Sequence, residues 1–256
     1  MEKKGLLFHA KHAYMPNNLG YCGPDENGTI LNHLEEAKAG DDLVRTLSGF
    51  EAAYPFLKLI ARNSGREVFD YSVPEAYWIG NELLAKVDPS DFLGFARSEL
   101  KGAGMKNLQT GFKVLRGEAV PHHSFYVMST YAGGDGDGPT LSDDGARKVA
   151  ELMDNCRISW GTVREVDGSE LVVRYQPLVI EEHGLALAGP REKKVRYDPR
   201  VRPFGTVEPG DVVSIHWNYA CEILSQRQAR NINRYSLADI DLVNRAVSAD
   251  PRRKRR

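Results

Sequence analysis

The sequence predicts an α+β fold. A mostly α-helical first part, residues 1–150, precedes a small β-barrel with a carboxy-terminal helix, residues 151–247, and a basic flexible tail, residues 248–256. Two observations predict this order. In the first part apolar residues recur at spacings of three and four, which is typical of amphipathic helices. Beyond Asn155 apolar and polar residues alternate, which is typical of strands buried on one face.

Helical spacing extends over most of the first part. The opening segment from His9 to Asp25 is the exception, because it holds too many glycine and proline residues for a helix. We expect helices over residues 28–47, broken in two at Gly40, and over residues 50–61, 73–87, 91–100 and 105–115. A glycine- and aspartate-rich linker at 132–139 then leads to a further helix over 146–153, which starts near Ser142.

The second part carries the signals of a small barrel. Asp167-Gly168 tolerates the positive φ angles of a tight turn, so residues 159–166 and 170–175 are predicted to form a hairpin. Further strands are expected over 178–182, 194–197 and 212–217. Five short strands in about 60 residues indicate a closed or partly closed barrel. Residues 225–246 return to helical spacing and are predicted to form the terminal helix.

Composition and charge exclude several classes of function. The 34 Lys and Arg residues balance 35 Asp and Glu residues, so no overall field favours nucleic acid. No apolar run reaches the roughly 18 residues that span a bilayer. The sequence also lacks the glycine-rich phosphate loops and the catalytic motifs of common hydrolases and proteases. We therefore expect no membrane partner and no nucleic-acid partner.

The cysteines indicate the compartment. There are three, Cys22, Cys156 and Cys221, and an odd, sparse set argues against a secreted disulfide framework. No signal-peptide core precedes His9. We therefore expect a cytoplasmic protein with free thiols, in which Cys221 is a packing residue.

Two motifs of the second part carry a resemblance to a known family. Cys156, at the start of the first predicted strand, is followed by Gly161-Thr162-Val163, and Gly210-Asp211-Val212-Val213-Ser214-Ile215-His216 forms the last predicted strand. These motifs, in this order and with a hairpin between them, resemble the HypC/HupF family of nickel-iron hydrogenase maturation chaperones. The resemblance covers residues 156–247 and implies an OB-like barrel.

The resemblance also implies a function and a site. In that family the matching cysteine and histidine hold iron that carries cyanide and carbonyl ligands, so Cys156 and His216 are the expected metal ligands. A thiolate is a soft donor and an imidazole a borderline one, which suits a low-spin ferrous ion. The implied partners are hydrogenase maturation proteins or the hydrogenase large subunit, with Trp160 and Trp217 as expected partner-binding residues. Trp160 stands where the family has proline, and Cys156 follows a whole predicted domain instead of opening the chain.

A second candidate metal site lies in the first part. Its candidate ligands are Cys22, His9, His12, His122 and His123. Adjacent residues of an extended segment point to opposite faces, so at most one of His122 and His123 is expected to bind the same ion. The alternative is structural: Cys22 sits in a tight turn, and the histidines bond buried backbone. If this site holds the metal, the protein is an enzyme or sensor centred on the first part, with the barrel as a docking module.

Further segments resemble an uncharacterised prokaryotic family associated with hydrogenase genes. They are Leu19-Gly20-Tyr21-Cys22-Gly23-Pro24, Glu75-Ala76-Tyr77-Trp78-Ile79-Gly80-Asn81 and Pro121-His122-His123-Ser124-Phe125. Together they extend the resemblance over nearly the whole chain. Glu75 and Asn81 either line a pocket or satisfy helix starts and contacts between helices.

Overall fold

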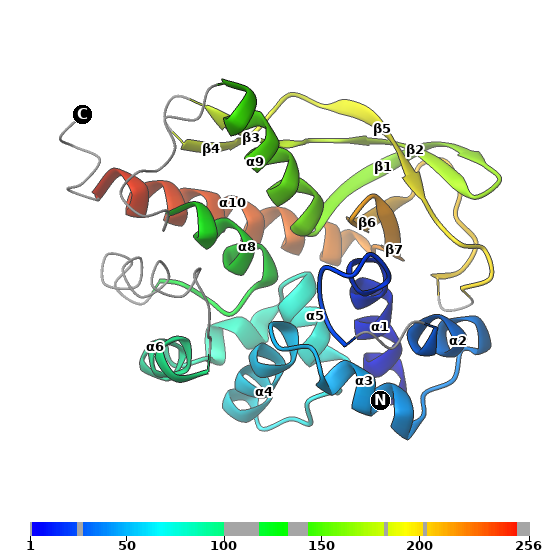
Figure 1. The fold of residues 1–256 in the computed structure, drawn as a ribbon, viewed down its shortest axis with the longest axis horizontal. Helices are drawn as coiled ribbons and strands as arrows, with labels where there is room; N and C mark the ends of the chain where they lie inside the picture. Colours follow the sequence, from blue (N-terminus) through cyan, green and yellow to red (C-terminus); the bar gives the residue numbers. More distant parts are fainter. Residues whose placement is uncertain are drawn as a thin grey trace.

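The computed structural model describes residues 2–24, 28–99, 118–132, 143–181, 184–201 and 204–249. It has the predicted α+β architecture, with amino-terminal helices, a five-stranded barrel and a carboxy-terminal helix (Figure 1). The helix predicted over 105–115, nearly all of the linker predicted at 132–139, and the tail beyond residue 249 lie outside the described residues.

Most predicted helices of the first part are confirmed, but the single helix predicted over 73–87 is divided in two at Gly80, whose φ is 90°. They are α2 (Thr29–Glu36), α3 (Asp41–Ser48), α4 (Ala53–Ser64), α5 (Ser72–Trp78), the 3₁₀-helix η1 (Glu82–Lys86) and α6 (Pro89–Ser98). Gly40 separates α2 from α3, as predicted. The described residues of this part also form α8 (His123–Ala132), which the periodicity does not indicate, and α9 (Asp143–Cys156), which starts beside Ser142 as predicted and continues three residues beyond the predicted end.

The prediction of a non-helical opening segment is wrong over most of its length. Helix α1 covers Glu2–Asn18 and includes Pro16. The glycines of this segment come after Asn18, so the argument from composition holds only for the loop at 19–24. A proline near the end of a helix removes one hydrogen bond, the one to the carbonyl four residues earlier. In α1 that carbonyl belongs to His12.

The barrel closes in the order β1-β2-β5-β7-β6. Its strands are β1 (Ser159–Asp167), β2 (Glu170–Tyr175), β5 (Arg191–Arg196), β6 (Val212–His216) and β7 (Tyr219–Ile223). The Asp167-Gly168 hairpin is confirmed, with φ of 58° at Gly168.

Two details of the predicted barrel are corrected. Strand β3 (Leu178–Glu181), predicted as a barrel strand, pairs instead with β4 (Gly184–Leu187) in a separate two-stranded sheet. Its place in the barrel is taken by β7, which lies between the last predicted strand and the predicted terminal helix. β7 pairs with β6 and meets β5 at a single parallel bridge, Arg196 with Tyr219, which closes the barrel.

Helix α10 (Gln226–Ala249) joins the two parts of the molecule. Figure 1 shows it running between the helices of the first part and α9 with the β3–β4 sheet. One buried core contains apolar residues of all three regions, among them Leu57 of α4, Val173 of β2 and Ile232 of α10. Within the described part of the chain, none of the helices has the length and apolarity that crossing a bilayer requires.

Candidate metal centre

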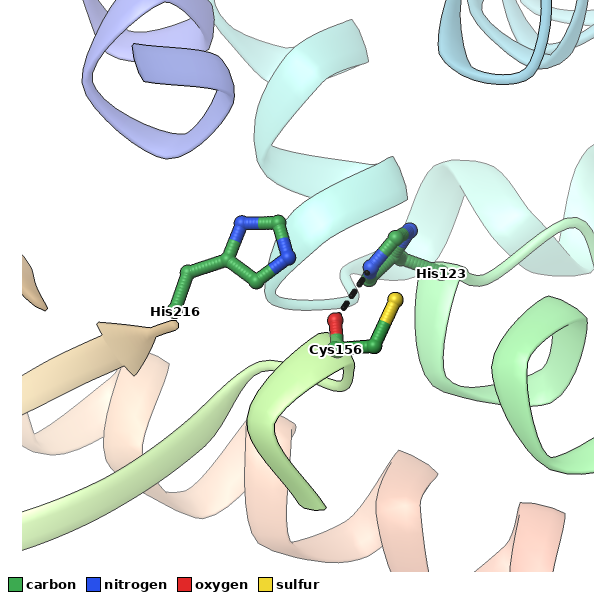
Figure 2. A group of neighbouring side chains, drawn as sticks. All are labelled: His123, Cys156 and His216. Atoms are coloured by element: carbon green, nitrogen blue, oxygen red, sulfur yellow. Dashed lines mark hydrogen bonds between the residues drawn. The ribbon is translucent and has the colours of Figure 1, made fainter. Parts of the chain in front are cut away.

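Three donor side chains from different elements meet at one point. His123 is the first residue of α8, Cys156 the last of α9 and His216 the last of β6. One ligand atom from each lies within 4.8 Å of the other two (Figure 2). Metal–donor bonds of about 2.0–2.3 Å place donors on opposite sides of an ion up to about 4.6 Å apart. A metal ion therefore needs only a small inward movement of these side chains.

The barrel brings Cys156 and His216 together although 60 residues separate them in the sequence. Strands β1 and β6 are antiparallel neighbours, with Ser159 opposite Ile215. The pairing continues past the end of the strands, because the Trp217 N–H donates to the Asn155 carbonyl at 2.9 Å. Cys156 lies at the end of a helix, not at the start of a strand as predicted, because β1 begins only at Ser159.

The His216 ring is held with one nitrogen free. Its Nδ1–H donates to the His12 carbonyl at 2.7 Å. This carbonyl is available because Pro16, four residues later in α1, has no N–H to donate to it. Nε2 has no hydrogen-bond partner among the described residues, although the nearby Cys156 carbonyl raises the pKa of the ring, and Figure 2 shows that edge of the ring turned toward His123 and Cys156. Burial lowers the pKa of His216 to about 4, so Nε2 carries a lone pair near neutral pH.

The other two donors are bonded or protonated without a metal. His123 Nε2–H donates to the Cys156 carbonyl at 2.9 Å, and its Nδ1 accepts from the Tyr77 hydroxyl at 3.0 Å. To bind a metal, one of these nitrogens must leave its partner. Burial lowers the pKa of His123 well below its usual value, so this ring is also neutral. Burial, and then the charge of Cys22, raise the pKa of the Cys156 thiol to about 12, so a metal must displace its proton.

Trp78 packs against four imidazole rings. Its ring centroid lies 4.6 Å from that of His123, 5.5 Å from His9, and 5.6 Å from both His12 and His216. The two candidate sites of the sequence therefore overlap, although Cys22 and His122 lie elsewhere. His9, His12 and His123 from the first part surround the same indole as His216 from the barrel.

His9 and His12 lie beside the donor group without belonging to it. His9 Nδ1 accepts from the Trp78 indole N–H at 2.8 Å. His12 Nδ1–H donates to the Phe8 carbonyl at 2.9 Å, and its Nε2 accepts from the Ser214 hydroxyl at 3.1 Å. The group within metal-binding distance, among the described residues, comprises His123, Cys156 and His216. For His12 the bonds match the structural alternative, since it binds backbone and a hydroxyl.

His122 points to a different place from His123. Its Nδ1–H donates to the buried carboxylate of Asp239 on α10 at 2.7 Å. Asp239 also accepts a hydrogen bond from the Phe125 backbone N–H, in the first turn of α8. Asp239 therefore anchors the turn of α8 that carries His123.

Cys22 lies in the loop after α1 and lines a cavity of 1080 Å³ together with Glu51 and Tyr126. Burial and the nearby charge of Glu51 raise the pKa of its thiol to about 11. Cys221 is buried on β7 against Met15 and Tyr219, consistent with a packing role.

The remaining predicted residues lie elsewhere. The Arg157 guanidinium lies over the Trp160 ring, with 5.8 Å between Cζ and the ring centroid. Trp217 stacks on the exposed Tyr21. Glu75 and Asn81 make the structural contacts named as one alternative. Asn81 caps η1 and donates to Glu75, whose carboxylate accepts from Arg227 at 2.7 Å and from Gln228 at 3.1 Å.

Sequence reasoning misses Tyr77 and Trp78, which bond or pack against the donor rings. It also misses Pro16 and Asp239, which act on the donors through the His12 carbonyl and through the first turn of α8. Only Pro16 leaves a usable signal, because a proline four residues after His12 in a helix marks a free carbonyl.

Fold and donor group together define a class: an α+β protein with a five-stranded barrel and a buried group of two imidazoles and one thiol. The chain belongs to a family of unknown function, DUF6390, whose profile matches residues 1–250. This confirms the expectation of an uncharacterised family over nearly the whole chain. No match was found among curated proteins or among solved structures. The resemblance to HypC/HupF therefore rests on the two sequence motifs.

Proposed function

We propose that this protein is an accessory protein of nickel-iron hydrogenase maturation that holds an iron fragment at His123, Cys156 and His216. The observation that carries the proposal is the convergence of these three donors within 4.8 Å, with Nε2 of His216 unpartnered among the described residues. The iron and its cyanide and carbonyl ligands come from the resemblance of residues 156–247 to HypC/HupF. The protein acts as a carrier and not as a catalyst.

The number of donors supports an iron that brings ligands of its own. Three protein donors around a ferrous ion leave other coordination positions open, as in facial sites of two histidines and a carboxylate. In this chain a thiolate takes the place of the carboxylate. A six-coordinate iron held by three protein donors has three positions left, which suffice for cyanide and carbonyl ligands. His123 adds a third donor to the cysteine and histidine that the motifs indicate.

The surroundings suit a cargo that must be kept from water and then released. His123 and His216 are buried among aromatic rings, whereas Cys156 is half-buried, so we place the route to the site on the Cys156 side. A partner protein would approach on this side, near the exposed Tyr21 and its stacked neighbour Trp217. Free thiol ligands require a reducing compartment, so the proposal includes a cytoplasmic location.

Infrared spectroscopy on protein purified anaerobically after co-expression with the hydrogenase maturation machinery tests the proposal. We expect about one iron per chain and bands of metal-bound cyanide and carbonyl. The bands should disappear in Cys156→Ala and His216→Ala, and should shift or weaken in His123→Ala. Cys221→Ala, which removes a packed thiol of β7, is the matched control and should keep them. Wild-type protein that carries iron without these bands, or no iron, would overturn the proposal.

A further inference from the structure

The loop that follows α1 is fixed at the same end of the barrel as His216. The ring of Tyr21 stacks on Trp217, with centroids 4.1 Å apart and 11° between the planes, and Trp217 is the chain neighbour of His216. Asn17 Nδ2 donates to the carbonyls of Cys22 at 3.2 Å and Pro24 at 2.6 Å. These contacts place Cys22 directly beside a residue that touches the His216 segment.

The same loop also lies near α8, the helix that begins with His123. Cys22 and Tyr126 line one cavity of 1080 Å³, and Tyr126 lies one helical turn after His123 on α8. Besides burial, the charges of Cys22 and Cys156 both raise the pKa of Tyr126. The two thiols therefore lie near the same phenol, with Cys22 on the cavity side and Cys156 in the donor group.

The site also has an unsatisfied position. His216 is only 2 % exposed, its Nε2 faces the group, and this atom has no partner among the described residues. Cys22 lies outside the group of atoms within 4.8 Å of one another, so it is near the site without being part of it in the metal-free protein.

The geometry points to Cys22 as a fourth ligand, which the loop at 19–24 brings in when the site binds a bare divalent transition-metal ion. The inference rests on the proposed metal binding at His123, Cys156 and His216. Two thiolates and two imidazoles form the donor set of closed tetrahedral sites. Each thiol gives up its proton to solvent when its sulfur binds, so the bare ion releases two protons.

The loop at 19–24 then responds to the kind of metal that is bound. A bare ion brings no ligands, so Cys22 fills the open position and closes the site. An iron fragment with its own cyanide and carbonyl ligands leaves no position for Cys22, so the loop stays out. The position of the loop then distinguishes a loaded carrier from one occupied by a stray cation.

Anaerobic titration of the full-length protein with Co²⁺ tests the inference, because cobalt absorption reports thiolate ligands and tetrahedral geometry. We expect the wild type to bind one Co²⁺ with intense thiolate-to-metal charge transfer. Cys22→Ala should still bind one Co²⁺, but with about half of that intensity and at least tenfold lower affinity. Cys221→Ala, the matched control, should behave as the wild type does.

The Co²⁺ titrations distinguish failure of Cys22 as a ligand from failure of the three-donor site. If Cys22→Ala binds Co²⁺ with the same charge-transfer intensity and affinity as the wild type, Cys22 is not a ligand. The three-donor site then remains. If the wild type binds no stoichiometric Co²⁺, or if Cys156→Ala and His216→Ala bind it as the wild type does, the donor site fails and the inference fails with it.

Discussion

Burial sets the protonation state of every donor side chain in the candidate centre. It lowers the pKa values of His123 and His216 and raises those of Cys22 and Cys156. Near neutral pH the imidazoles are therefore ready to bind a metal ion, whereas the thiols must first lose their protons. Metal affinity consequently depends on pH through sulfur and not through nitrogen.

The pH dependence of metal affinity can be predicted from the number of thiols that bind the metal. In Cys22→Ala only Cys156 loses a proton, so Co²⁺ affinity should rise about tenfold per pH unit between about pH 6.5 and 8.5. In the wild type two thiols bind, and the rise should be about a hundredfold per unit. Competition titrations with a chelator of known affinity measure both slopes. A flat profile in Cys22→Ala would contradict ligation by Cys156.

How far the sequence predicts single residues depends on how local their signal is. Cys156 and His216 stand in motifs, so the sequence alone pairs them. It groups His123 with Cys22 instead, because the contact of His123 with Cys156 spans 33 residues and leaves no local pattern. The rule that adjacent histidines diverge assumes an extended segment, whereas His123 begins α8 and His122 precedes it.

Among the elements, α1 supports the centre without supplying a donor. It supplies His9 and His12 beside Trp78, and its Pro16 leaves the His12 carbonyl to the His216 ring. A residue usually regarded as a helix breaker thus helps to orient a donor. Hydrogen bonds of this kind to the second nitrogen of a ligating histidine fix its tautomer and strengthen its binding.

Replacing Pro16 with alanine should separate helix stability from metal affinity. The new N–H competes with His216 Nδ1 for the His12 carbonyl, so Co²⁺ affinity should fall about 10–100-fold. The stability of the metal-free protein should change little, because removal of a proline from the helix offsets the weaker hydrogen bond of the buried His216 Nδ1–H. Thermal denaturation and Co²⁺ titration measure the two effects. Pro89→Ala, at the exposed start of α6, is the control and should bind Co²⁺ as the wild type does. Equal Co²⁺ affinity in Pro16→Ala and wild type would show that Pro16 does not help to orient His216.

At the scale of elements, sequence periodicity predicts the helices from α2 to α6 and the β1–β2 hairpin. It fails where pairing depends on distant partners. Residues 178–181 have the pattern of a barrel strand, whereas residues 219–223 lie between the last predicted strand and the predicted terminal helix. Closure of the barrel by β7, with β3 left to pair with β4, is decided by contacts with β5 and β6. No local pattern encodes that choice.

The molecule as a whole is held together by polar contacts across its two parts. Buried Glu75 of α5 joins Arg227 and Gln228 of α10, Lys11 of α1 forms an ion pair with Glu222 of β7, and the apolar core is continuous. The predicted boundary near residue 150 falls within α9. It stays a prediction, but the shared core favours unfolding of both parts in one transition.

The buried imidazoles should make the fold sensitive to acid. Burial lowers the pKa of His9 to about 3 and that of His12 well below its usual value. Between pH 6.5 and about 3 the unfolded chain binds protons that the folded chain does not, so stability falls as pH falls. Each such histidine lowers the free energy of unfolding by up to about 1.4 kcal/mol for each pH unit of acidification.

Urea denaturation of the metal-free protein at pH 7, 6 and 5 measures this loss. The free energy of unfolding should fall progressively, and His9→Leu should show a shallower dependence because one buried imidazole is gone. Equal stability at all three pH values would contradict the neutral, enclosed state of these rings.

The indole of Trp78 touches both ligand rings, His123 and His216, and only two other tryptophans, Trp160 and Trp217, occur in the chain. Its near-ultraviolet emission is therefore coupled to whatever occupies the space between those imidazoles. A paramagnetic Co²⁺ ion at that point would quench the indole, so the emission of Trp78 reports whether a bare ion occupies the site. Binding and removal of Co²⁺ can then be followed in real time without any attached dye.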